Sequence, residues 1–79
     1  MYKLCESHEN PGLKPTFIQN VDSIGAGIGA VELIAGYLRY DYLTFELDEE
    51  NDAADVFIAK TGTYNTKIYT IEKVAENES

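Results

Sequence analysis

The chain has 79 residues, and its 14 acidic residues outnumber its six Lys and Arg, so the formal net charge is −8 with His8 neutral. A chain of this length forms one small domain and leaves no room for separate cofactor and substrate domains. The hydrophobic fraction of 44% is too high for a disordered chain. The six cations are spread along the sequence, so binding to nucleic-acid phosphates or to anionic lipid is disfavoured.

The hydropathy of the chain also bears on its location. No apolar run approaches the roughly 18 residues that a membrane-spanning helix needs. Residues 1–6 lack the long apolar core of a signal peptide. We therefore expect a cytoplasmic protein, in the host cytoplasm if a phage encodes it, that binds neither membranes nor nucleic acid directly.

The first 21 residues are predicted to hold one strand and a loop. Residues 2–6 alternate weakly, as a short strand does, and residues 8–12 have the composition of a turn. Pro15 keeps the next segment out of a helix, and residues 16–21 have an extended character. We assign residues 1–21 to a strand followed by a loop that contains Pro and Gly.

A helix is predicted over residues 22–40. Asp22 or Ser23 is a suitable N-cap, because its side-chain oxygen can accept a free amide of the first turn. Arg39, placed in the last turn, suits the negative end of the helix dipole. Apolar residues then recur at steps of three and four, which gathers them on one buried stripe: Val21, Ile24, Ile28, Val31, Ile34 or Ala35, and Leu38.

The apolar period changes to two after Asp41, which predicts strands. We expect a three-stranded antiparallel meander over residues 42–74 and a frayed tail over residues 75–79. Residues 1–79 would then form a single α+β domain in the order β-α-β-β-β. One helix would pack on an antiparallel sheet of three to four strands.

Two residues have the types needed for thiol catalysis. Cys5 and His8 are spaced like a nucleophile and its base, but a buried thiol beside a loop histidine is the simpler interpretation. One cysteine forms no intrachain disulfide, and Cys5 with His8 does not supply the four ligands of a structural zinc ion. We expect no enzymatic activity, no cofactor and no metal.

Residues 25–30, GAGIGA, satisfy G-x-G-x-x-A and so resemble the dinucleotide-binding fingerprint. Polar residues precede the glycines where a buried strand is required, and hairpin patterning follows where further crossover helices are required. We therefore place the glycines inside the helix, where residues four apart make a smooth face. We expect that face to pack closely on the protein's own sheet. The alternative is a homodimer, or a small subunit of an assembly, that packs through Gly25–Ala30.

Half of the chain's carboxylates lie in 15 residues that contain no Lys or Arg: Asp41, Glu46, Asp48, Glu49, Glu50, Asp52 and Asp55. The spacing superficially copies an EF-hand, but Ala53 stands where that loop needs glycine and Ala59 where it needs a bidentate glutamate. A solvated loop that keeps the protein soluble is one interpretation. The other is a surface whose mutual repulsion a basic partner relieves on binding.

Tyrosines support the second interpretation, since Tyr is favoured at protein interfaces. We predict that Tyr40, Tyr42 and Tyr64 are partly exposed beside the seven carboxylates, and that Tyr37 and Tyr69 lie in the core. In size and charge the chain resembles small acidic phage proteins that mimic DNA and inhibit restriction, CRISPR or repair enzymes. This resemblance implies a non-enzymatic inhibitor whose partner is a basic nuclease or nucleic-acid-binding complex.

Overall fold

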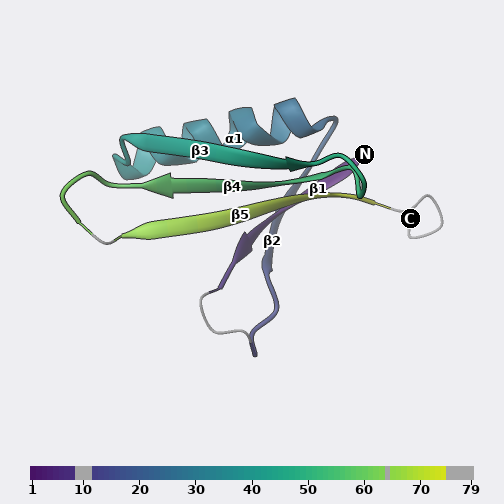
Figure 1. The fold of residues 1–79 in the computed structure, drawn as a ribbon, viewed down its shortest axis with the longest axis horizontal. Coiled ribbons are helices and arrows are strands. Elements are labelled where there is room, and N and C mark those ends of the chain that lie inside the picture. Colours follow the sequence, from purple (N-terminus) through teal and green to yellow (C-terminus); the bar gives the residue numbers. More distant parts are fainter. Residues whose placement is uncertain (9–11, 64, 75–79) are drawn as a thin grey trace.

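The fold is a five-stranded antiparallel sheet with one helix on one face (Figure 1). The computed structural model describes residues 1–8, 12–63 and 65–74. The strand order in the sheet is β2-β1-β5-β4-β3, so that β2 and β3 are the two edges. The elements in chain order are β1 (Tyr2–Ser7), β2 (Thr16–Val21), α1 (Ile24–Leu38), β3 (Tyr42–Asp48), β4 (Ala53–Ala59) and β5 (Thr66–Lys73).

The α+β class with one helix on an antiparallel sheet is confirmed, but the prediction of three to four strands in β-α-β-β-β order is wrong. Residues 16–21, predicted as part of a loop, form the additional strand β2, which pairs with β1 alone. Pro15 stands immediately before β2, outside the ladder, where its missing N–H removes no hydrogen bond of the sheet. A proline next to an edge strand is therefore compatible with a sheet, although the local sequence pattern favours a loop there.

Ser23, one of the two predicted N-caps, caps the N-terminus of α1. Ser23 Oγ accepts the amide of Ala26 at 3.0 Å. At the other end the helix stops at Leu38, and Arg39 adopts a left-handed φ of 63°. The prediction that Arg39 lies in the last turn is therefore wrong. Arg39 closes the helix through its backbone N–H, which donates to the carbonyl of Gly36 at 3.2 Å.

The core lies between α1 and the sheet. Leu4, Val31, Val56, Ile58 and Ile71 are fully buried there. α1 packs over β4 and β5 and also contacts β1 and β2 (Figure 1). In the part of the chain that the structure describes, no helix is long and apolar enough to cross a membrane.

The expected close packing of the glycine face occurs at one residue, Gly27. A Cβ added to Gly27 would lie 2.6 Å from Cδ1 of Ile71, so only glycine lets the helix approach the sheet this closely. A Cβ on Gly29 would meet no atom within 4 Å, and one on Gly25 only Ser23 Oγ, at 3.9 Å. The prediction that the Gly25–Ala30 face packs on the sheet is therefore wrong for these two glycines.

The two tyrosines that we predicted in the core have different positions. Tyr69 is 2% exposed, as predicted, whereas Tyr37 is 88% exposed. Tyr37 follows the buried Ala35 by two residues, and two residues correspond to about 200° around a helix. Tyr37 therefore points away from the sheet, and its prediction as a core residue is wrong.

Candidate functional site

The sheet has one face covered by α1 and one face that points away from it, which we call the open face. On β4 the buried Val56 and Ile58 pack in the core beneath α1. Because strand side chains alternate between faces, Asp55 and Phe57 belong to the open face. The strand registers then place two groups there across β3, β4 and β5. One is acidic, namely Glu46, Asp48, Asp55 and Glu72; the other is largely apolar, namely Tyr42, Phe57, Ala59 and Ile68.

Three of the seven predicted carboxylates hold the fold together. Asp41 Oδ1 accepts the amide of Thr61 at 2.8 Å, and this hydrogen bond lowers the pKa of Asp41. Asp48 accepts both the side-chain amide of Asn51, at 2.8 Å, and its backbone amide, at 3.2 Å. These contacts lower the pKa of Asp48 and fix the β3–β4 turn. Asp41 and Asp48 therefore stabilise turns by accepting hydrogen bonds.

Asp52 also has structural partners. It sits in the β3–β4 turn with a left-handed φ of 51°, which Asp tolerates better than most residues. Its Oδ2 accepts the hydroxyl of Tyr2 at 2.8 Å, which raises the pKa of Tyr2, and it lies 3.5 Å from Nζ of Lys73. Asp52 therefore ties the turn to β1 and β5.

The other four carboxylates have no such partners. Within residues 1–8, 12–63 and 65–74, no ion pair or side-chain hydrogen bond is found for Glu46, Glu49, Glu50 or Asp55, which we call the free carboxylates. Glu46 and Asp55 are directly opposite in the β3–β4 register. Opposed residues have Cβ atoms about 5 Å apart, where two like charges destabilise a sheet. Folding alone does not explain this pair.

A groove of about 360 Å³ opens at this end of the sheet. Asp48, Asp55 and Glu72 line it together with a single cation, Lys73. Lys73 is within ion-pair distance of Asp52, and Glu72 lies 3.9 Å from Lys3. The charge of the groove is therefore negative, which suits the side chain of a Lys or Arg from another molecule.

Tyr40, Asp41 and Tyr42 lie at the start of β3, away from the free carboxylates. Tyr42 is 58% exposed on the open face, and Tyr40 is half-buried against the core. Tyr64 lies outside the described residues. Asp41 precedes β3 and Asp48 ends it, so these residues are roughly 20 Å apart at about 3.3 Å per residue. The structure thus divides the predicted site between the two ends of β3.

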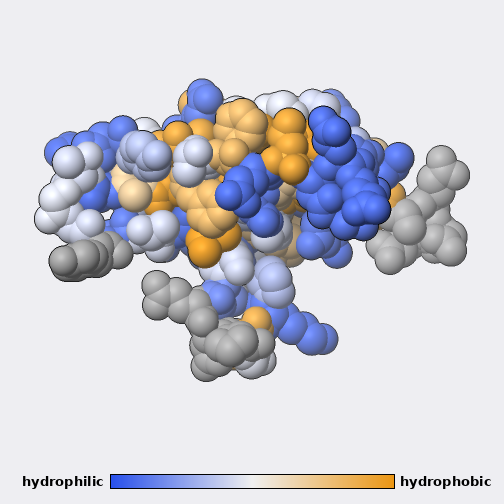
Figure 2. Space-filling view, viewed as in Figure 1, coloured by the Kyte–Doolittle hydropathy of each residue, from blue (hydrophilic) through white to orange (hydrophobic). Residues whose placement is uncertain are grey.

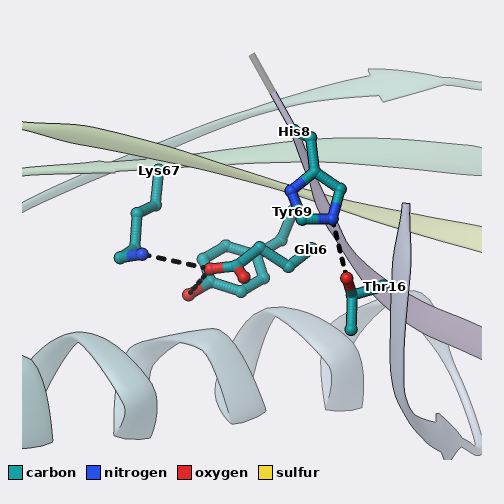
Figure 3. A network of polar contacts seen from close by, with 5 residues as sticks. All are labelled: Glu6, His8, Thr16, Lys67 and Tyr69. Atoms are coloured by element: carbon teal, nitrogen blue, oxygen red, sulfur yellow. Dashed lines mark hydrogen bonds and ion pairs between the residues drawn. The ribbon is translucent and has the colours of Figure 1, made fainter. Parts of the chain in front are cut away.

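A second polar cluster lies at the end of β1, and the sequence analysis missed it (Figure 3). Glu6 Oε1 accepts Nζ of Lys67 at 3.2 Å and the hydroxyl of Tyr69 at 3.4 Å. Burial and the neighbouring Glu6 raise the pKa of Tyr69 to about 12. Nε2 of His8 is 2.7 Å from Oγ1 of Thr16. These residues are brought together by the pairing of β1 with β5 and β2, which no local sequence motif reveals.

This cluster is built to satisfy polar groups at the edge of the core. The charge of Lys67 is balanced by Glu6, and a tyrosine with a pKa near 12 is a poor base at neutral pH. Cys5 is 8% exposed, and burial raises the pKa of its thiol. A raised pKa disfavours the thiolate that nucleophilic catalysis needs. Among the described residues, no group of three His, Cys, Asp or Glu is placed to hold a metal ion.

Comparison with family models, with curated proteins and with solved structures gives no match. The function is therefore inferred from the geometry of the chain itself. The feature that folding explains least is the set of free carboxylates, and above all the opposed pair Glu46 and Asp55.

Proposed function

We propose that this protein is a non-enzymatic, protein-binding module whose free carboxylates occupy a basic, nucleic-acid-binding surface of another protein. It would act as a DNA-mimicking inhibitor of the anti-CRISPR or anti-restriction type, in the cytoplasm of the host. The observation that carries this proposal is the cross-strand pair Glu46 and Asp55, for which the described residues supply no neutralising cation.

The energetics of this pair favour a role in binding. Two carboxylates opposite each other repel in the free protein, and a partner that brings Lys or Arg between them converts the repulsion into attraction. Glu49 and Glu50 in the adjacent turn extend the negative surface beyond the end of the sheet. A nucleic-acid-binding protein presents the matching array of cations, because it must neutralise phosphates.

The rest of the open face supplies the apolar part of an interface. Tyr42 is 58% and Ile68 36% exposed, and Phe57 is half-buried between them on β4. Protein interfaces combine aromatic anchors with a polar rim, and charge complementarity accelerates their association. The open face has both parts side by side, which supports a protein partner over a small molecule.

The test is a competition between this protein and DNA for purified CRISPR nucleases and restriction enzymes. We expect the wild-type chain to displace labelled DNA from a target enzyme, with an affinity that falls as salt is raised. In Glu46→Gln/Asp55→Asn we expect the affinity to fall at least about tenfold, which corresponds to about 1.4 kcal/mol.

A matched control carries the same change in net charge. Asp22→Lys also raises the net charge by two, at an exposed residue that makes no ion pair within the described residues and lies just before α1. We expect this variant to bind within about threefold of wild type. Equal losses for both variants would mean that only the net charge matters, and no loss for either would refute the proposed surface.

A further inference from the structure

The edge strand β3 has neither a bulge nor a proline that would block its open side. It pairs with β4 in an unbroken register from Tyr42 to Asp48, without a bulge. It contains no Lys, Arg or Pro. Edge strands expose a row of unpaired N–H and C=O groups, and proteins commonly block them with bulges, prolines or lysines. In the described structure β3 has β4 as its single neighbour and leaves its other side open.

The helix-facing side of β3 is also incompletely covered. Phe45 and Leu47 point to the side of the sheet that carries α1, yet they are 46% and 55% exposed. α1 packs chiefly over β4 and β5, so the outer strand extends beyond its cover. Figure 2, seen in the same view as Figure 1, shows hydrophobic residues in the middle of the molecule around α1 and β3, with hydrophilic residues towards the β3–β4 turn.

The C-terminal part of α1 and the start of β3 border an open groove. Glu32 and Gly36 line this groove of about 240 Å³ together with Tyr42 and Leu43. A Cβ on Gly36 would meet no atom within 4 Å. The helix therefore leaves the helix-facing side of β3 open at the start of the strand as well.

We propose that β3 accepts an extended segment of the partner protein as a sixth strand with alternating basic and apolar residues. This inference rests on the proposed function and specifies how the partner binds. Side chains of an added strand alternate between the two faces of the sheet. On the open face they would meet Glu46 and Asp48, which calls for Lys or Arg. On the helix side they would meet Phe45 and Leu47, which calls for apolar residues.

Charge selects this occupant over a second copy of the chain. Two β3 strands paired with each other would bring together two molecules that each carry a formal charge of −8, with the free carboxylates of both at the junction. A basic strand would neutralise Glu46 and Asp55 as it forms backbone hydrogen bonds. The acidic residues of β3 therefore disfavour self-association by repulsion and favour a cationic strand by attraction.

The experiment uses two synthetic, end-capped peptides of equal composition. One alternates four Lys with four Val, and the other has four Lys followed by four Val. We expect calorimetry to show the alternating peptide binding at least about tenfold more tightly, because only its side chains match both faces of the edge. In the complex, hydrogen exchange should slow at amides of β3 and remain unchanged at the opposite edge, β2.

A pair of variants separates the edge from general electrostatics. Phe45→Glu places a carboxylate on the helix-facing side of β3, and Leu33→Glu places one on the outer surface of α1, where Leu33 is 78% exposed. Both variants increase the attraction for a cationic peptide. We expect Phe45→Glu nevertheless to lose at least about tenfold in affinity for the alternating peptide, while Leu33→Glu retains it.

Three results would overturn the strand addition. Equal binding of both peptides, with loss in Glu46→Gln/Asp55→Asn, would leave the acidic binding surface intact and refute the sixth strand. Protection confined to amides outside β3 would do the same. A wild-type dimer that Phe45→Glu converts to a monomer would show that a second copy of the chain occupies the edge.

Discussion

The two faces of the sheet differ in how fully folding uses their residues. Under α1 every large side chain at the centre is buried, and the contact between Gly27 and Ile71 leaves no space for a methyl group. On the open face Glu46 and Asp55 oppose each other with no ion pair among the described residues, and Tyr42 is exposed at the start of the same strand. The first face can be explained by stability alone. The second includes two opposed carboxylates that stability alone would select against, and we place the proposed binding surface there for this reason.

The largest effect that we expect from this contrast concerns two glycines of α1. Gly27→Ala should destabilise the protein by roughly 1 kcal/mol net, because overpacking against Ile71 costs about 1–3 kcal/mol and exceeds the helix-propensity gain. Gly29→Ala meets no neighbouring atom and should stabilise by about 0.5–1 kcal/mol. Thermal unfolding resolves the two, since 1 kcal/mol shifts Tm by roughly 4–8 °C in a domain of this size.

The same two variants also test the homodimer alternative. If the flank with Gly25 and Gly29 packed on a second copy, Gly29→Ala would lose stability in a manner that depends on protein concentration. A concentration-independent gain for Gly29→Ala together with a loss for Gly27→Ala would confirm that one glycine is used by the core and the other is free. Opposite signs would contradict this division of the helix.

Alkaline titration tests the covered face by a different route. The pKa of Tyr69 is about 12, above its ordinary value of 10.0, so the unfolded chain loses this proton first. The stability contributed by the neutral, buried Tyr69 is fully present below pH 10 and is lost as the pH rises towards 12.

Tyrosinate absorbance against pH measures this directly. The Tyr69→Phe variant should lose the last-titrating component and show a shallower fall in stability in the same pH range. Tyr37→Phe is the matched control, because Tyr37 is 88% exposed and its removal should leave the last-titrating component and the fall in stability unchanged. Titration of Tyr69 at its ordinary pKa of 10.0 would mean that the covered face is more open than the structure indicates.

Local patterns were sufficient to predict most of the secondary structure. The stripe around Val31 and Ala35 predicted α1, and alternation after Asp41 predicted β3, β4 and β5. Residues 16–21 were missed as a strand because the pairing of β2 with β1 is set by tertiary structure, and Pro15 next to it favoured a loop. The close approach at Gly27 was not predicted, because the prediction rested on Gly25 and Gly29, four residues apart, whereas Gly27 lies on the buried stripe with Val31 and Ala35.

From the sequence, the candidate site could be predicted only as a stretch rich in acidic residues. The sequence located seven carboxylates, but separating Asp41, Asp48 and Asp52 from the free ones required the positions of Thr61, Asn51 and Lys73. The opposition of Glu46 and Asp55 depends on the β3–β4 register, which follows from the length of the turn between them. The cluster of Glu6, Lys67 and Tyr69 joins residues more than 60 positions apart.

The smallest change in stability that we expect is on the open face, and its sign distinguishes a functional from a structural role of Glu46. Glu46→Gln removes one of two opposed charges, so it should raise stability by about 0.2–1 kcal/mol at low salt. Added salt should shrink this difference, because it screens the repulsion in the wild-type chain. Asp48→Asn is the control: it also removes a charge from β3 but weakens the contacts to Asn51, so it should give no gain.

Urea denaturation measures the free energy of unfolding of both variants, provided that the m-value stays the same as in wild type. A stabilising Glu46→Gln that also weakens binding to the partner would show that the carboxylate is kept at a cost to the free protein, which is the signature of a residue selected for function. A destabilising Glu46→Gln would instead mean that Glu46 supports the fold. The contrast between the two faces would then no longer distinguish function from stability, and Glu49 and Glu50 alone would remain as candidates for the binding surface.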